Sequence, residues 1–285
     1  MGVNHVRVAA ELGALAFVCD LDLEGKVKPI VDLYKISGFI DIKEALNSHP
    51  DVRHLIVAVP TEHHAEIAQL CLARGINFLL EKPISENIED AEKIARFSAF
   101  SDSKISIGYI ERFNPAVRSM FDILDNPSLF PIGQIVSVNI KRVGGLPRTA
   151  NNVIIDLMTH DFDILLKIMG RQPLNVTTNK LTSDGIVNSA QVLLDFGDAS
   201  AVCEANWVSP VKIRTIIVTG TLGMIELNLI SQEIKLINAK NIISTSFKEE
   251  PLMNEIMCFL ENDFSVACTL EEAIEALTLT LRANT

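Results

Sequence analysis

The amino-acid sequence predicts a two-domain α/β protein, in which a parallel sheet covered by helices precedes an α+β domain with a large, mostly antiparallel open sheet. The first half alternates strand-like apolar runs with helical patterns, as parallel sheets with crossover helices do. The second half carries one apolar run after another, separated by Gly, Asp, Ser and Pro, which is typical of antiparallel sheets. The pattern changes between Gly108 and Phe113, so we expect domains over residues 1–109 and 110–285.

The elements of the first half are bounded by local signals. Val6, Ala9 and Gly13 recur at helical spacing. Asp41 and Glu44 have the spacing of a helix-capping pair, and Gly75 is a typical residue just after a helix end. In chain order we expect a helix that ends near residue 13, a strand over 14–19, a short helix after 41, a strand over 55–59, a helix over 62–74, a strand over 76–80, a helix from about 88, and a strand over 105–109.

The second half is expected to contain few helices. Gly170 stops a helical pattern, and Val192, Leu194 and Phe196 alternate as in a half-buried strand. We expect helices over 115–124, 153–169 and 270–282 and strands over 135–140, 191–196, 201–207, 213–219 and 224–229. The last helix is expected to pack back on the first domain.

Composition narrows the partners and the compartment. A formal net charge of -11 disfavours nucleic acids and anionic membranes. The five cysteines, an odd number without CxxC spacing, suggest a reducing compartment. No apolar stretch approaches bilayer length, and Glu11 interrupts the run before Ala14-Leu15-Ala16 that imitates a signal peptide. We therefore expect a cytoplasmic protein with a small-molecule substrate.

Three strands of the first half end in polar or special residues, namely Asp20, Pro60-Thr61 and Glu81-Lys82. Ligands of open parallel sheets bind outside the carboxyl ends of the strands. An acidic residue after the second strand of a dinucleotide-binding fold accepts hydrogen bonds from a ribose diol and repels a 2′-phosphate. Asp20 would therefore favour NAD over NADP, although a turn or cap role is the alternative.

The expected phosphate loop, G-x-G-x-x-G after a first strand, is incomplete. Gly2 lies 18 residues before Asp20, the spacing of the third glycine, and no strand or earlier glycine precedes it. Either the chain start is truncated or the pyrophosphate is bound poorly. Loss of a central strand would leave unpaired edges, so the first alternative is favoured.

Lys82, Asp156 and His160 are the candidate catalytic residues. Asp156 and His160 are four residues apart on one expected helix and share a face, and a carboxylate beside an imidazole raises its basicity. Such a pair suits abstraction of a hydroxyl proton, while Lys82 would bond the reacting oxygen. The alternatives are a satisfied core histidine and a solvated loop lysine.

Three motifs extend this pattern: Glu81-Lys82-Pro83, Gly108-Tyr109-Ile110-Glu111-Arg112-Phe113-Asn114-Pro115 and Asp156-Leu157-Met158-Thr159-His160-Asp161. In this order they resemble the glucose–fructose oxidoreductase / inositol dehydrogenase / MocA family over nearly the whole chain. The resemblance implies a Rossmann domain, a catalytic pair of Lys82 and His160, and Asp156 as the orienting carboxylate. It also implies a cofactor side that includes Pro60, Thr61, His64 and Glu81, and a homodimer or homotetramer formed through the second sheet.

Within the family, the second motif and Arg142 resemble UDP-N-acetylglucosamine 3-dehydrogenases. The resemblance implies substrate contacts by Tyr109, Arg112, Asn114, Arg142 and Arg148, with the arginines on a diphosphate. Salt bridging is the alternative for the arginines. Gly144-Gly145-Leu146-Pro147 departs from the Pro-rich stretch of that subgroup, so another polyol or inositol dehydrogenase stays open.

Two other classes of function stay open. A non-catalytic sensor on the same fold would explain the incomplete phosphate loop, whereas the intact Lys82, Asp156 and His160 argue against it. A metalloenzyme would use Asp156, His160 and Asp163, which lie near one helical face and include two carboxylates and an imidazole.

Overall fold

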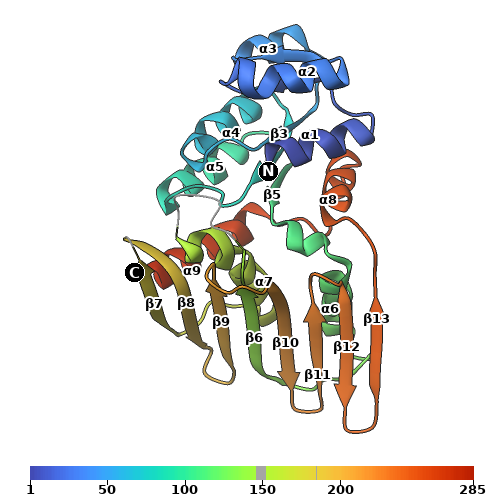
Figure 1. Cartoon of the computed structure of the whole chain (residues 1–285), viewed down its shortest axis with the longest axis vertical. Helices are drawn as coiled ribbons and strands as arrows, with labels where there is room; N and C mark the ends of the chain where they lie inside the picture. The colour runs from blue at the N-terminus through green and yellow to red at the C-terminus, as the bar shows by residue number, and fades with distance from the viewer. Residues whose placement is uncertain (146–151, 184) are drawn as a thin grey trace.

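A computed structural model describes residues 1–145, 152–183 and 185–285. Figure 1 shows a helix-rich upper part above a broad sheet, and three separate sheets are present in the described residues. Two are parallel sheets of the first half, and the third is an eight-stranded, mostly antiparallel sheet of the second half. This arrangement confirms the predicted fold class. No described helix is both long and apolar enough to cross a membrane.

Local signals place the elements of the first half. The Asp41 carboxylate accepts hydrogen bonds from the Lys43 and Glu44 N–H groups, and Gly75 adopts a φ of +65° after a helix end. The strands form the parallel pairs β1-β2 and β3-β4-β5. In chain order the elements are α1 (Gly2–Glu11), β1 (Phe17–Cys19), α2 (Lys28–Tyr34), β2 (Ser37–Phe39), α3 (Ile42–Ser48), β3 (His54–Val57), α4 (His64–Ala73), β4 (Asn77–Glu81), α5 (Ile88–Ser98) and β5 (Ile105–Gly108).

Strand β4 is the centre of its sheet and reads as an uninterrupted apolar run because both of its faces are covered. Phe78, Leu79 and Leu80 are fully buried. Leu80 belongs to a core with Ala68 of α4 and Ala91 of α5, whereas Leu79 belongs to a second core. The burial fixes the carboxyl end of β4, where Glu81 is the last residue of the strand and Lys82 follows it.

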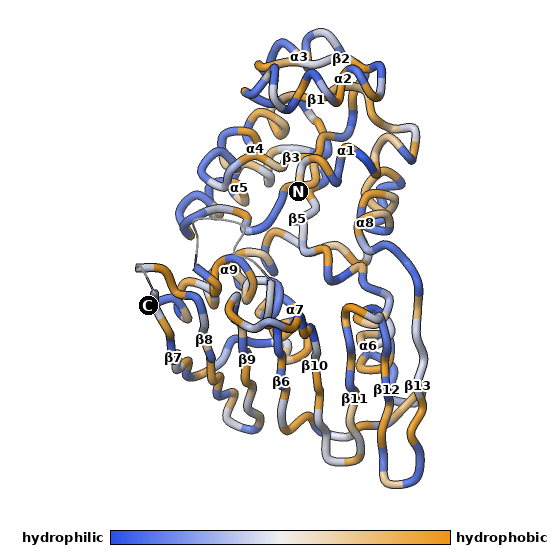
Figure 2. The backbone as a smooth tube through the Cα atoms, viewed as in Figure 1, coloured by the Kyte–Doolittle hydropathy of each residue, from blue (hydrophilic) through white to orange (hydrophobic). Residues whose placement is uncertain are grey.

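The second half is built around the order β13-β12-β11-β10-β6-β9-β8-β7, in which only the β6–β9 pair is parallel. Side chains alternate between its faces: Val192 and Leu194 are buried, whereas Leu193 is 44% exposed. Figure 2 shows this alternation as changing colour along the strands. The elements are α6 (Pro115–Asp125), β6 (Ile135–Val143), α7 (Thr159–Met169), β7 (Asn175–Ser183), β8 (Ile186–Asp195), β9 (Ser200–Asn206), β10 (Ile213–Gly220), β11 (Gly223–Asn228), β12 (Glu233–Asn238), β13 (Ile242–Ser246), α8 (Pro251–Leu260) and α9 (Leu270–Asn284).

The last two helices return to the first half of the chain. Leu252 and Ile256 of α8 pack with Val8 of α1 and Leu79 of β4 in the second core. Helix α8 lies beside α1 in Figure 1. Helix α9 contacts α5, α7 and β5. These contacts bring residues from both ends of the chain to the carboxyl end of β4.

Helix 153–169 differs from the sequence prediction in its first turn. The structure has a π-helical turn over Ile154–Met158, and α7 follows from Thr159. One extra residue per turn re-aims the side chains there, and such turns are frequent at functional sites. Short 3₁₀ turns over Thr61–His63 and Ile110–Phe113 lie after β3 and β5, at the same edge of the sheet.

Candidate active site

Lys82 and Asp156 meet at the carboxyl end of β4. The Lys82 Nζ donates a 2.7 Å hydrogen bond to the Asp156 backbone oxygen and lies 3.6 Å from the Asp156 Oδ1. Their side chains are 16% and 14% exposed, so water screens the pair weakly. The structure thus joins the two predicted residues across 74 positions of sequence.

His160 lies on the first turn of α7, four residues after Asp156. The Tyr109 ring stands edge-on to the imidazole, with 5.9 Å between the ring centroids. The imidazole Nδ1 is buried and has no hydrogen-bond partner among the described residues. Since the Asp156 carboxylate contacts Lys82, its predicted role of orienting His160 stays a prediction.

Burial and nearby cations set the protonation of His160. Burial lowers the His160 pKa well below its usual range, and the positive charges of Lys82, Arg142 and Arg214 lower it further. The imidazole is therefore neutral at pH 7 and has a lone pair free to accept a proton. Burial also lowers the pKa of Lys82, while the Asp156 and Glu81 carboxylates oppose this shift.

Arg142 lies on β6 and is one of the arginines that the sequence predicts to contact the substrate. Its Nε donates to Asp161 at 2.6 Å and its Nη1 to Glu111 at 2.8 Å. The Nη2 is buried and unpartnered within the described part of the chain. Its charge acts on both Lys82 and His160. One NH2 group of this anchored guanidinium thus has no partner among these residues, and such a group matches the oxygens of an anionic ligand.

Arg112 occupies a different environment. Its side chain is 1% exposed, pairs with Asp163 at 2.6 Å and Glu272 at 2.7 Å, and donates to the Ala267 backbone oxygen. All of its nitrogens are used in these contacts. This geometry favours the salt-bridge alternative for Arg112 over a substrate contact.

Tyr109 and Asn114, two other predicted substrate residues, form hydrogen bonds to other residues of the chain. The Tyr109 hydroxyl lies 3.2 Å from the Thr159 hydroxyl, and burial raises the Tyr109 pKa well above its usual range. Asn114 caps α6 by accepting from the Ala116 N–H and also donates to a backbone oxygen. Arg148 lies outside the described residues.

The metal-site alternative is not supported by the arrangement. Asp163 is bound to Arg112 and is 2% exposed, so it does not share a site with Asp156 and His160. No cluster of three or more His, Cys, Asp or Glu suited to a metal occurs in the described ranges.

The predicted cofactor residues lie at the strand ends of the first half. Asp20 follows β1, is 41% exposed, and lies 3.4 Å from the Lys26 Nζ. Gly2 begins α1, where a Cβ would be 4.0 Å from the Ala58 side chain. The helix has no side-chain cap hydrogen bond, so its first N–H groups and its dipole suit a phosphate, and Asp20 suits a ribose diol. These residues therefore fit a dinucleotide.

His64 holds two backbone segments together. Its Nδ1 lies 2.9 Å from the Pro83 oxygen and its Nε2 lies 3.1 Å from the Val59 oxygen. Burial lowers the pKa of this imidazole. Because both ring nitrogens face backbone oxygens, His64 supports the Lys82 loop and the turn that begins at Pro60, and its predicted place on the cofactor side stays a prediction.

Two buried residues near Lys82 were not foreseen from the sequence. His5 of α1 hydrogen-bonds Glu81 at 2.7 Å, and Glu255 of α8 is 1% exposed beside it. Both lie on the buried faces of short helices, among apolar residues. A buried polar residue within an apolar helix face was the only available signal.

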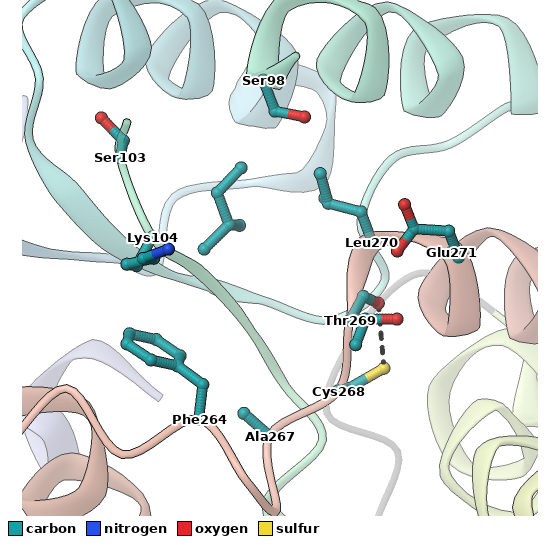
Figure 3. A pocket seen from close by; sticks show the side chains of 10 residues that line it. Ser98, Ser103, Lys104, Phe264, Ala267, Cys268, Thr269, Leu270 and Glu271 are labelled. Atoms are coloured by element: carbon teal, nitrogen blue, oxygen red, sulfur yellow. Dashed lines mark hydrogen bonds between the residues drawn. The ribbon is translucent and has the colours of Figure 1, made fainter. Parts of the chain in front are cut away.

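A cavity of about 220 Å³ lies away from this centre, between α5, β5 and the segment before α9. Figure 3 shows Ser103 and Lys104 on one side of it and Leu270 and Glu271 on the other. None of the candidate catalytic residues lines it. The cavity is therefore separate from the candidate active site.

Comparison with known sequences identifies the same family in both halves. Residues 4–109 match the family model described as "Oxidoreductase family, NAD-binding Rossmann fold", and residues 132–226 match the "GFO/IDH/MocA C-terminal domain". The rhizopine catabolism protein MocA of Rhizobium meliloti is 30% identical over 70% of this chain and 66% of its own length. UDP-N-acetylglucosamine 3-dehydrogenase of Acidithiobacillus ferrooxidans is 25% identical over 62% and 53%. The matches thus span about half to two thirds of these relatives.

Comparison with solved structures shows the same fold. The UDP-N-acetylglucosamine 3-dehydrogenase GnnA of Acidithiobacillus ferrooxidans superposes with a TM-score of 0.88 at 20% identity, over 99% of this chain and 92% of that one. An oxidoreductase from Agrobacterium radiobacter, solved with NAD+, L-tartaric acid and magnesium, gives 0.85 at 16% identity over 100% and 93%. Since both halves match models of one family, the chain belongs to the glucose–fructose oxidoreductase / inositol dehydrogenase / MocA family of oxidoreductases.

Proposed function

We propose that the chain is an NAD-dependent dehydrogenase that transfers hydride between a sugar or nucleotide-sugar hydroxyl and nicotinamide. The observation that carries this proposal is the placement of a neutral, half-buried His160 near a lysine that Asp156 holds. The two groups offer a proton acceptor and a hydrogen-bond donor to the same hydroxyl oxygen. The family match of both halves supports the same class of reaction.

Each residue then has a defined step in the oxidation. His160 accepts the hydroxyl proton, and the Lys82 ammonium donates a hydrogen bond to the oxygen as it acquires carbonyl character. Asp156 holds Lys82 in place and favours its charged form. Bound NAD would accept the hydride that leaves the carbon bearing this hydroxyl. In the reverse direction His160 returns the proton.

The cofactor would lie across the strand ends of the first half. The N-terminus of α1 at Gly2 offers backbone N–H groups to a phosphate. The Asp20 carboxylate accepts both hydroxyl hydrogens of a ribose and repels a 2′-phosphate, so NAD is preferred to NADP. The turns at Pro60-Thr61 and Glu81-Lys82 flank the nicotinamide end, where His64 fixes the backbone.

Arg142 would bind the substrate. Its unpartnered Nη2 suits a diphosphate, as in the UDP-sugar of one relative. A substrate without phosphate, such as the inositol of other relatives, is the second candidate. Arg148, the other arginine predicted to contact the diphosphate, would complete the site. The outward face of the eight-stranded sheet, with the exposed Val136 and Leu193, would form the homodimer or homotetramer interface.

The test measures the reduction of NAD+ and of NADP+ by the absorbance at 340 nm. UDP-N-acetylglucosamine and myo-inositol are each tried as substrate with each cofactor. The proposal expects reduction with at least one of these hydroxyl compounds and faster reduction of NAD+ than of NADP+. Binding of NADH, measured by its fluorescence, with no oxidation of any compound would favour the sensor alternative. Absence of both would contradict the proposal.

A further inference from the structure

Three titratable side chains form a buried group behind Lys82, from three different elements. His5 comes from α1, Glu81 from the end of β4, and Glu255 from α8. They are 3%, 8% and 1% exposed. The proposed reaction uses none of these side chains directly, so their burial needs another explanation.

Glu81 connects this group to the lysine. Its Oε2 accepts a 3.2 Å hydrogen bond from the Lys82 backbone N–H. Its Oε1 lies 2.7 Å from the His5 Nε2, which donates in a neutral imidazole of the matching tautomer. Both oxygens of the Glu81 carboxylate are thus engaged, and its charge acts on Lys82.

His5 and Glu255 each keep unpartnered polar atoms. The His5 Nδ1 and both carboxyl oxygens of Glu255 are buried without a hydrogen bond among the residues that the structure describes. Such groups are costly unless they find a partner. The two sites complement each other, because a protonated carboxyl is a donor and the Nδ1 is an acceptor when the Nε2 carries the hydrogen. Helices α1 and α8 pack together, and both side chains lie beside Glu81.

We propose that Glu255, protonated, donates to the His5 Nδ1 directly or through one water molecule, and that the resulting Glu255–His5–Glu81 triad positions Lys82 and fixes the charge behind it. The triad carries one negative charge whether its shared proton lies on Glu255 or on His5. Lys82 therefore faces a constant counter-charge while substrate protons move. His5 and Glu255 are positioning residues, since they act only through Glu81.

The surrounding charges agree with this assignment. Burial raises the pKa of Glu255 well above its usual range, and the Glu81 carboxylate raises it further, so both favour the protonated acid. On the other side, Lys82 faces Asp156, Glu81 and Arg142. Arg7, in the middle of α1, and Glu250, the residue just before α8, pair with each other and are more than a third exposed. The only buried carboxyl of the group without a cation or donor is thus Glu255.

The experiment measures the ring nitrogens of His5 by NMR in the full chain labelled with ¹⁵N-histidine. The chain has six histidines, and the signal lost in His5→Gln assigns His5. We expect a hydrogen-bonded Nδ1 in the wild type and in Glu255→Gln, whose carboxamide N–H also donates. In Glu255→Leu the Nδ1 signal moves to the position of a free acceptor. The matched control is Glu261→Gln, at an exposed end of the same helix, which leaves the signal unchanged.

An identical Nδ1 signal in the wild type and in Glu255→Leu overturns the proposal. If Glu255→Leu does not fold, the wild type decides alone, because a free-acceptor Nδ1 signal there overturns it. The consequence for Lys82 rests on the proposed function, whereas these signals are read without cofactor or substrate. Failure of the dehydrogenase assay with a hydrogen-bonded Nδ1 would therefore count against the function and not against the triad.

Discussion

Arg112 gives the sharpest separation between a structural and a substrate-binding arginine. Arg112→Met keeps an unbranched apolar stem but removes the guanidinium, which leaves Asp163, 2% exposed, without its cation. Breaking one side of a buried ion pair costs about 3–5 kcal/mol, since the remaining charge is buried without its counter-ion. Burial already raises the Asp163 pKa against the opposing effect of Arg112, so the carboxyl takes up a proton once Arg112 is gone. The expected loss of folding stability is measured as a lower urea concentration at the midpoint of unfolding.

Two further variants control this prediction. Arg112→Met with Asp163→Leu removes both charges and regains most of the lost stability, because an apolar pair of similar volume replaces the ion pair. Glu272→Gln changes stability by about 1 kcal/mol or less, since Glu272 is 32% exposed. The single variant Arg112→Met could instead unfold at the wild-type urea concentration and lose affinity for a UDP-sugar. That result would refute the assignment of Arg112 to a stabilising ion pair.

Three other predictions follow from the same structure. Asp20→Ala should reduce the preference for NAD+ over NADP+ in kcat/KM by roughly tenfold, since it removes a repulsive carboxylate; an unchanged ratio contradicts the placement of the ribose. Asp156→Asn should move the alkaline limb of the pH–rate profile to lower pH, because the Lys82 pKa loses a counter-charge that raises it; a limb that stays in place speaks against their coupling. Glu255 has a pKa raised from 4.5 in the folded chain, so between 4.5 and the folded-state pKa only the unfolded state releases its proton, and wild-type stability falls as pH rises through this window. The stability of Glu255→Gln relative to the wild type should therefore rise with pH by up to about 1.4 kcal/mol per pH unit, and parallel stability curves would exclude a raised Glu255 pKa.

The strand and helix pattern was predictable wherever burial imposes a simple period. The run at residues 76–80 is β4 because both faces of a central parallel strand are covered. Strand β7 was missed because its residues Asn175–Ser183 are mostly polar and exposed at the sheet edge. The π-helical turn Ile154–Met158 was missed because its apolar periodicity barely differs from that of an α-helix.

The candidate site was predictable where polar residues follow strands, and less so where contacts depend on tertiary packing. Lys82 and Asp156 meet as motif order suggested, because β4 and the π-turn converge. The predicted role of Arg112 could not be separated from salt bridging, since its partner Glu272 is 160 residues away. Glu255 resembled an ordinary helical glutamate, because only the packing of α8 against α1 buries it.

The most direct test of the central claim uses Lys82→Met and His160→Gln in the NAD+ reduction assay at 340 nm, with NADH binding and thermal unfolding measured in parallel. Lys82→Met removes the hydrogen-bond donor to the hydroxyl oxygen, and His160→Gln removes the proton acceptor. Neither substitution touches the core of the fold or the phosphate end of the cofactor site. General acid–base contributions are typically about 10²–10⁴-fold, so kcat should fall at least 100-fold with NADH affinity within a few fold of the wild type. Turnover within threefold of the wild type in either variant would contradict the assignment of this centre.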